Sequence, residues 1–425
     1  MRRSVPRTLV LLLGLAGSFL ALTNAATGQE GVRRVTLRQA LEEFAENSPA
    51  LKVARSEAAQ VAGAARQSQV YSNPSLEFDH DNLEHDDPVH GTERFWEQTI
   101  KYVQEVEWPG RTSARRRAAS HTIDASAAGL RDEAVQLASE VREAYALAWF
   151  AEETERAVGQ SAEVIRRVAD DAEVRLEAGD ISAYEARRLR LERLRAEQEL
   201  ADAGLRARAA RRHLASLISP GARTEEVGPS EGLREIPPPV GREVALRDLD
   251  LRPDLEAAAR ELDAAQAGVE IASFARKPAP TVGLGYRHHR DGFAGAAVGV
   301  SVPLPFFDKG RGTRAEAAAQ SSAAAHRLDL RRRLAEYELL NALDRYAAGR
   351  TRVEVAVESL IADGESLLSS ATAAYAEQEM TLVELLDAAG AFQGARLTAL
   401  SLQSEAWIAY FDLLRVLGRG PLEEP

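Results

Sequence analysis

The chain has no cysteine among its 425 residues. Disulfide bridges, thiolate metal sites, cysteine nucleophiles and a lipid anchor on an N-terminal cysteine are therefore excluded. The sequence also lacks a P-loop, a His-Glu-x-x-His motif and a Gly-x-Ser-x-Gly motif, so nothing indicates an enzyme or a cofactor. A formal net charge of −12 argues against nucleic acid as a partner.

Proline is missing from two long stretches, residues 110–219 and 306–420, and all seventeen prolines lie outside them. A proline inside a helix costs about 3 kcal/mol, so these gaps predict long helices. The first stretch carries small and apolar residues at steps of three and four: Ala127, Leu130, Ala134, Leu137, Val141, Ala144 and Ala148. This spacing predicts a coiled-coil seam or the core of a helical bundle. Up to Gly179 such a helix would be about 100 Å long.

Each long stretch has one predicted interruption, at Gly179–Ser182 in the first and at Gln378–Thr381 in the second. Ser182 and Thr381 are each followed three positions later by a glutamate, Glu185 and Glu384 respectively. This is the pattern of a capping box, in which hydroxyl and carboxylate each satisfy a free backbone N–H. Both stretches are therefore predicted to be antiparallel pairs of long helices.

The N-terminus has the pattern of a secretory signal peptide. Arg2, Arg3 and Arg7 precede an apolar run from Leu9 to Leu22, and small residues follow up to a predicted cleavage site after Ala25. An uncleaved anchor helix is the alternative, but the run is shorter than the ~20 residues of a membrane span. We expect the mature chain to be exported.

Four segments alternate between apolar and polar residues, as half-exposed strands do. They are Ser75–Leu83, Thr99–Trp108, Thr281–His289 and Ala296–Leu304, with a polar loop predicted at 82–95 and a helix at 35–70. Their length is about what a tilted strand needs to cross a bilayer. The predicted lipid-facing residues are Ile100, Tyr102, Trp108, Val298, Val300 and Val302.

The predicted order of helix, two strands, long helix, turn and long helix occurs twice. Ser48-Pro49 and Arg252-Pro253 each open a helix, and Gly110-Arg111 and Gly310-Arg311 open the long ones. We expect a signal peptide (1–25), a first repeat (26–218), a Pro- and Gly-rich connector (219–252), a second repeat (253–420) and a tail (421–425). Four strands cannot close a barrel, and open edges are not tolerated in lipid, so the strands must be pooled between copies.

This duplicated pattern resembles the TolC-type outer-membrane efflux proteins. The resemblance rests on Pro-Gly-Arg at 109–111, Lys-Gly-Arg at 309–311 and Pro-Leu-Pro-Phe-Phe-Asp at 303–308, and it covers the mature chain. It implies a mostly α fold with a small β part. A long antiparallel α-helical barrel would continue into a transmembrane β-barrel with four strands per chain, closed by trimerisation. The partners would be outer-membrane lipid, a periplasmic adaptor protein and an inner-membrane efflux pump.

Within that family, the sequence at 104–111, Gln-Glu-Val-Glu-Trp-Pro-Gly-Arg, is similar to the branch that serves heavy-metal and cation efflux pumps. Many members of that branch carry a lipidated N-terminal cysteine, which is absent here. The resemblance implies a passive exit duct in the outer membrane of a Gram-negative bacterium, with its helices in the periplasm. Drugs or secreted protein are alternative cargo, and a soluble periplasmic coiled-coil scaffold or adaptor is an alternative function.

The family's narrow periplasmic end is ringed by acidic residues just after the second turn. Glu384 and Asp387 occupy the matching positions, and their spacing of three places both carboxylates on one helix face. Three copies would place six carboxylates around one aperture, where they would attract cations. Helix capping explains Glu384 equally well.

The family also has contacts between neighbouring turns that hold this end closed, made by an arginine, an acid and a tyrosine. Tyr375 matches the tyrosine and Glu185 the acid, beside the turn at Gly179, whereas Met380 stands at the position of the arginine. The resemblance therefore implies closure by other contacts, with these four residues as candidates for the turn contacts and for adaptor docking. An ordinary seam aromatic is the alternative for Tyr375.

Five of the eight histidines lie near the predicted strand ends: His80, His85, His90, His288 and His289. Imidazole together with the neighbouring carboxylates suits Zn²⁺, Cu²⁺ or Ni²⁺, so these residues are candidate metal ligands. Their spacing matches no defined metal motif, and a solvated hairpin explains the same composition. We therefore favour the hairpin interpretation and assign no metal site.

Overall fold

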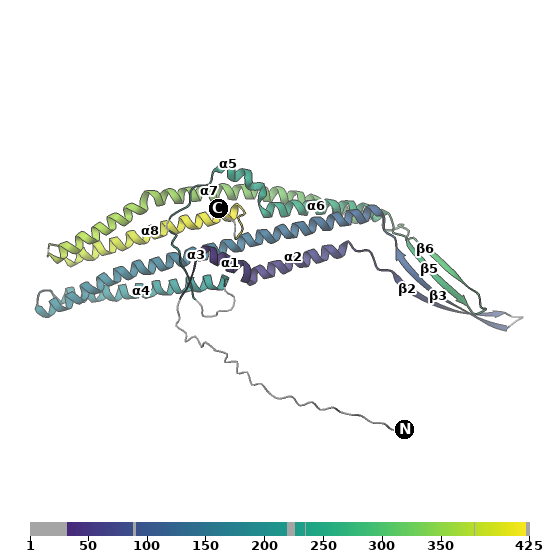
Figure 1. The fold of residues 1–425 in the computed structure, drawn as a ribbon, viewed down its shortest axis with the longest axis horizontal. Helices are drawn as coiled ribbons and strands as arrows, with labels where there is room; N and C mark the ends of the chain where they lie inside the picture. Colours follow the sequence, from purple (N-terminus) through teal and green to yellow (C-terminus); the bar gives the residue numbers. More distant parts are fainter. Residues whose placement is uncertain (1–31, 88–90, 219–225, 234, 378, 422–425) are drawn as a thin grey trace, which may run out of the picture.

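The computed structural model describes residues 32–87, 91–218, 226–233, 235–377 and 379–421. The predicted signal peptide and most of the predicted tail lie outside these residues. Figure 1 shows an elongated molecule in which a bundle of long helices has strands at one end and the turns between the long helices at the other. No helix in the described part of the chain is both long and apolar enough to span a membrane.

The elements follow a repeated order. The first series comprises β1 (Arg33–Val35), α1 (Leu37–Asn47), α2 (Pro49–Ser68), β2 (Ser75–Asp87), β3 (Gly91–Glu105), α3 (Pro109–Ala178) and α4 (Ala183–Ile218). After β4 (Val227–Pro229), α5 (Arg242–Arg247) and the 3₁₀ turn η1 (Asp248–Leu251), the second comprises α6 (Pro253–Ser273), η2 (Phe274–Arg276), β5 (Thr281–His289), β6 (Ala294–Ser301), α7 (Arg311–Ala376) and α8 (Leu382–Val416).

The long helices confirm what the missing prolines predict. α3 has 70 residues and α7 has 66, so each is about 100 Å long. The apolar seam of α3 is displaced by one residue from the prediction in its first half, where Ala128 and Val135 are buried and Ala127 is exposed. From Val141 onward the predicted and observed seams coincide. One-residue errors arise because small residues are frequent on several faces of this helix.

The helix predicted over residues 35–70 is wrong in one respect, because it is two helices. Thr36 begins α1 with a capping box to Gln39. Ser48 then leaves the helical conformation, with φ −54° and ψ 124°, and its Oγ accepts a hydrogen bond from the N–H of Leu51. Pro49 is the first residue of α2, where it needs no hydrogen-bond donor.

Alanine and glycine at the seams allow the helices to approach closely. Gly349 on α7 faces Ala406 on α8, and a Cβ added at Gly349 would lie 3.2 Å from the Ala406 Cα. The widest part of the core lies at mid-length, where Tyr145, Tyr346 and Phe411 are almost fully buried. The long helices are thus held together most strongly at mid-length, and fewer apolar residues are buried between them toward the turns.

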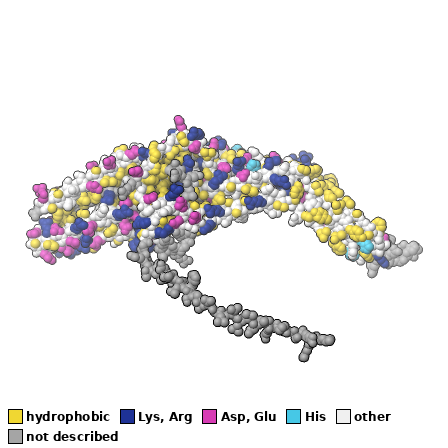
Figure 2. Space-filling model, viewed as in Figure 1, with side chains coloured by type: hydrophobic (Ala, Val, Ile, Leu, Met, Phe, Trp, Pro, Cys, Tyr) yellow, Lys and Arg dark blue, Asp and Glu magenta, His cyan; other side chains and the backbone are white. Residues whose placement is uncertain are grey.

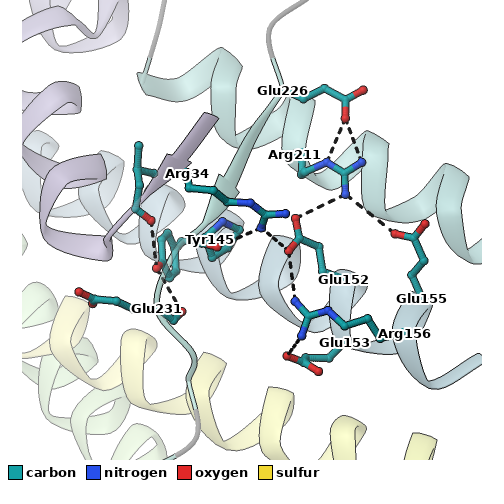
Figure 3. Close-up of polar contacts among 11 residues, drawn as sticks. Arg34, Tyr145, Glu152, Glu153, Glu155, Arg156, Arg211, Glu226 and Glu231 are labelled. Carbon is teal, nitrogen blue, oxygen red and sulfur yellow. Dashed lines mark hydrogen bonds and ion pairs between the residues drawn. The ribbon is translucent and has the colours of Figure 1, made fainter. Parts of the chain in front are cut away.

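A buried ionic cluster at mid-length connects the N-terminal strand to the connector (Figure 3). Glu152 on α3 is only 4% exposed and accepts hydrogen bonds from Arg34 on β1 (2.5 Å) and from Arg211 on α4 (3.4 Å). Arg211 also pairs with Glu226, next to β4, at 2.9 Å. Loss of Glu152 would leave these guanidinium groups without their buried partner, which is the costly case for buried ion pairs.

β1 and β4 form a two-stranded parallel sheet beside this cluster. The Tyr145 hydroxyl donates to the carbonyl oxygens of Val35 and Glu231, both at 3.3 Å. Burial raises the pKa of Tyr145 to about 12, so this hydroxyl stays a donor at any physiological pH. The connector is therefore held firmly against the helices.

The four longer strands form one antiparallel sheet in the order β2-β3-β5-β6. β5 has its predicted bounds. The loop predicted at 82–95 is wrong, because β2 runs on to Asp87 and β3 begins at Gly91. Cross-strand pairing satisfies the backbone there even though the apolar alternation has ended. Trp108 and Val302 were predicted on strands but lie beyond their ends, since β3 ends at Glu105 and β6 at Ser301.

The register places apolar side chains on one face of this sheet. One row across the four strands consists of Leu76, Tyr102, Leu284 and Val298, and the next consists of Phe78, Ile100, Tyr286 and Ala296. The large residues in both rows are exposed, between 44% and 72%, and Figure 2 shows hydrophobic side chains gathered over this end of the molecule. On the other face, the Lys101 ammonium pairs with Asp79 at 2.7 Å.

The two faces of β6 provide a direct test of this register. Val298 lies on the apolar face and Ala297 on the polar face, both in the middle of β6, whereas Val300 lies one residue from its end. If the apolar face contacts lipid, Val298→Arg should cost about 2–4 kcal/mol of folding free energy in a bilayer, because a charge at mid-membrane is poorly solvated. Ala297→Arg is the matched control at the same depth and should cost far less. Insertion into phospholipid vesicles during a urea titration measures both, and equal costs would contradict the register.

Candidate aperture and turn contacts

The turn between α3 and α4 and the turn between α7 and α8 both lie at the end of the molecule opposite the strands (Figure 1). Gly179 ends α3 with φ 84°, a left-handed conformation that favours glycine. The two hairpins touch through apolar side chains, since Ile181 beside the first turn packs in the same cluster as Leu382 and Leu386 of α8. The turns therefore form one surface.

Both predicted capping boxes are present. The Glu185 carboxylate accepts from the Ser182 N–H at 2.9 Å, and the Ser182 Oγ accepts from the Glu185 N–H at 3.2 Å. Hydrogen bonds from the Ser182 N–H and then from its hydroxyl lower the pKa of Glu185, and the charge of Arg175 lowers it further. Glu185 is therefore ionised at neutral pH.

Thr381 and Glu384 repeat this arrangement at the second turn. The Glu384 carboxylate accepts from the Thr381 hydroxyl at 2.7 Å and from its N–H at 2.8 Å. These two bonds lower the pKa of Glu384, the hydroxyl bond most. Asp387 lies three residues further on, and both acidic side chains are exposed. The two carboxylates thus share one face of α8 and point away from the core of the chain.

Met380, beside the second turn, is part of the apolar packing. Its partly buried side chain packs against a small cluster formed by Ala371, Leu385 and Ala388, together with Tyr375. A methionine suits this position because its flexible thioether fills irregular apolar space. The residue at the arginine position of the family pattern therefore contributes packing and no charge.

An arginine that the sequence analysis missed lies beside Tyr375. Arg175, in the last turn of α3, donates from Nη1 to the Tyr375 hydroxyl at 3.2 Å, and its guanidinium carbon lies 5.9 Å from the centre of the tyrosine ring. Arg175 therefore joins α3 to α7 and also acts electrostatically on Glu185. The only signal in the sequence is a basic residue in a last helical turn, which the helix dipole favours at many sites.

The candidate histidines do not converge. His80 and His288 flank Trp96 on the apolar face, with ring centres 6.5 Å and 5.5 Å from the indole. His289 lies on the opposite face, where its Nε2 is 3.8 Å from a Glu97 oxygen. In the described residues, no three His, Cys, Asp or Glu side chains are close enough together to hold a metal ion. The His85 side chain and His90 lie outside these residues.

Comparisons with known proteins agree with this architecture. The family model described as "Outer membrane efflux protein" matches residues 40–219. The cobalt-zinc-cadmium resistance protein CzcC of Cupriavidus metallidurans is 28% identical over 433 residues, which span 97% of this chain and all of CzcC. Among solved structures, CusC has a TM-score of 0.75 at 17% identity, with 92% of this chain and 94% of CusC covered.

The outer membrane protein VceC of Vibrio cholerae has a TM-score of 0.72 at 21% identity, with 91% of this chain and 97% of VceC covered. Identities this low show the fold alone. These two matches cover 92% and 91% of this chain, so the predicted fold is confirmed.

The contact between Arg175 and Tyr375 should limit the relative motion of the two hairpins. Because the chain has no cysteine, Asp180→Cys and Glu379→Cys introduce unique spin-label sites at the two turns. Arg175→Gln and Tyr375→Phe should each broaden the distance distribution measured by pulsed electron paramagnetic resonance. The double variant should be no broader than either single one, because both changes remove the same contact.

Arg187→Gln is the matched control for this experiment, since Arg187 is an exposed arginine on α4 near the same turn and should leave the distribution unchanged. Independent, additive broadening by Arg175→Gln and Tyr375→Phe would contradict the contact.

Proposed function

The chain belongs to the TolC-type outer membrane efflux protein family, and we propose that three copies form a passive exit duct for metal cations. It is an outer membrane efflux channel of a Gram-negative bacterium, and its family is not enzymatic. One observation carries the trimer proposal. Four strands with an exposed apolar face and two unpaired edges, β2 and β6, need further copies to close a barrel in lipid.

Such a channel works as a trimer with the components of an efflux pump. We propose that the partners are a periplasmic adaptor protein and an inner-membrane pump, which supply the energy and most of the selectivity. The surface formed by the two turns is the proposed docking site for the adaptor. Its candidate residues are Tyr375, Glu185, Gly179 and Met380, to which the structure adds Arg175.

The order of the helices and strands supports a division of the chain into two repeats. We propose that residues 26–218 and 253–420 are two copies of one unit, joined by the connector 219–252. The series from α2 to α4 and from α6 to α8 have the same order of elements and support this division. The short strand β4 then holds the connector against β1 of the first unit.

Metal cations are the proposed cargo for two reasons. The relative CzcC is a cobalt-zinc-cadmium resistance protein that aligns over its whole length. In addition, Glu384 and Asp387 are exposed on one face beside the second turn, so a trimer would present six carboxylates to one opening. Drugs or secreted protein are the alternative cargo. A soluble periplasmic scaffold would leave the apolar face of the sheet in water.

Removing the acidic charge should change the selectivity of the aperture. Glu384→Gln keeps a side-chain acceptor for the capping bond, and Asp387→Asn is nearly isosteric. The double variant should therefore assemble normally but lose cation selectivity and block by multivalent cations in planar bilayers.

The matched control removes two charges elsewhere. Glu358→Gln with Asp363→Asn changes exposed acids of α7 at least about 20 Å from the turn along the helix, and it should leave selectivity and block unchanged. Unchanged selectivity and block in the Glu384/Asp387 variant would reduce these two acids to residues that merely stabilise the start of a helix.

A further inference from the structure

The apolar face of the sheet continues past the end of β6. Val302, Leu304 and Phe306 follow Val298 and Val300 at alternate positions, and all are between 46% and 72% exposed. Phe307 is completely exposed, and every residue from 302 to 307 is exposed. An exposed run of apolar residues that extends a lipid-facing surface indicates contact with lipid. We call residues 302–307 the rim segment.

Proline makes the backbone of the rim segment suited to a membrane boundary. Pro303 and Pro305 have no N–H group, and successive groups of an extended chain point to opposite sides. One side of the segment therefore has no donor at these two positions. An unpaired N–H costs several kcal/mol in lipid but nothing where proline removes it. The segment can thus leave the sheet at the edge of the bilayer without unsatisfied donors there.

A close backbone contact gathers positive charge directly behind the rim segment. Gly310 has φ 62°, and a Cβ added there would lie only 2.5 Å from the Ala275 Cβ. Lys309 and Arg311 flank Gly310 in the sequence, and Arg276 follows Ala275 directly. The contact between Gly310 and Ala275 therefore brings cations from two distant parts of the chain together, at the junction of strands and helices.

The resulting cluster, which we call the basic collar, consists of Arg276, Lys277, Lys309 and Arg311. All four side chains are exposed, and none makes an ion pair within the described part of the chain. Lys277 lies over the Phe274 ring at 5.0 Å. The neighbouring acid, Asp308, accepts a hydrogen bond from the Gly310 N–H at 2.8 Å. Asp308 is thus already engaged, and Glu105 and Glu316 line the same pocket as Lys277 without an ion pair to it.

We propose that the rim segment and the basic collar form a binding site for anionic phospholipid at the periplasmic boundary of the outer membrane. Phe306 and Phe307 insert among the upper acyl chains, and the collar binds the headgroup phosphates. The order along the chain, apolar side chains, then aromatic rings, then cations, follows the order of layers in a membrane. The inference rests on the membrane placement of the strands and is independent of the cargo.

Lipid titration of the purified, delipidated oligomer, followed by native mass spectrometry, tests the proposal. Phosphatidylglycerol should bind more tightly than phosphatidylcholine with the same acyl chains. Lys309→Gln with Arg311→Gln should weaken phosphatidylglycerol binding about 25-fold, at about a factor of five for each lost cation. The preference should also shrink at high salt. Arg206→Gln with Arg208→Gln removes two exposed arginines at the same spacing from α4 and should have no effect.

A second measurement locates the rim segment itself. Phe307→Cys provides a unique labelling site, and a fluorophore attached there should be quenched by spin-labelled lipid. A label at Asp363→Cys on α7 should not be quenched. Absence of quenching at position 307 would overturn the insertion of the rim segment.

Equal binding of the two lipids, or equal losses in the collar and control variants, would overturn the site for anionic lipid. If Lys309→Gln with Arg311→Gln dissociates the oligomer in lipid-free detergent, the collar binds carboxylates of a neighbouring copy and the lipid proposal fails. In each of these cases, intact conductance in planar bilayers would show that only the lipid site is contradicted and that the proposed exit duct is not.

Discussion

The structure depends on one constraint, that backbone N–H and C=O groups must find partners where water is absent. The sheet has unpaired edges at β2 and β6, and each unpaired group would cost several kcal/mol in lipid. Pairing β6 of one copy with β2 of the next removes that cost for every edge group at once. A closed ring of copies is the arrangement that satisfies all of them, and it aligns the helical bodies below it.

The long helices must stay parallel over about 100 Å although little apolar surface is buried between them. Close seams built on residues such as Gly349 and Ala406 permit dense packing. The aromatic core and the Glu152 cluster fix the middle, including the connector. Toward the turns, the buried clusters are small. Motion of the hairpins is therefore easiest at the end where the acidic aperture is proposed, and a few polar contacts can control it.

Local signals explain why the helices could be predicted from sequence. Absence of proline, the glycine at 179 and the capping boxes at Ser182 and Thr381 each act within a few residues, and they place the end of α3 and the starts of α4 and α8 accurately. Strand ends were predicted less well. Pairing between β2 and β3 continues into polar residues, because the hydrogen bonds come from a neighbouring strand and require no apolar pattern.

The turn contacts also depend on residues that are far apart in the sequence, and they could not be predicted from it. Arg175 and Tyr375 are 200 positions apart, and no spacing rule relates them. Only the placement of α3 beside α7 and α8 brings them together. The acids Glu384 and Asp387 were proposed from their match to the family pattern, and helical periodicity then places both on one face because they lie one turn apart.

The mass of the purified complex tests the central claim most directly. Light scattering or native mass spectrometry in mild detergent should give three copies, because four strands per chain leave edges that only other copies can pair. A monodisperse monomer that is still folded and inserted in the membrane would contradict the account.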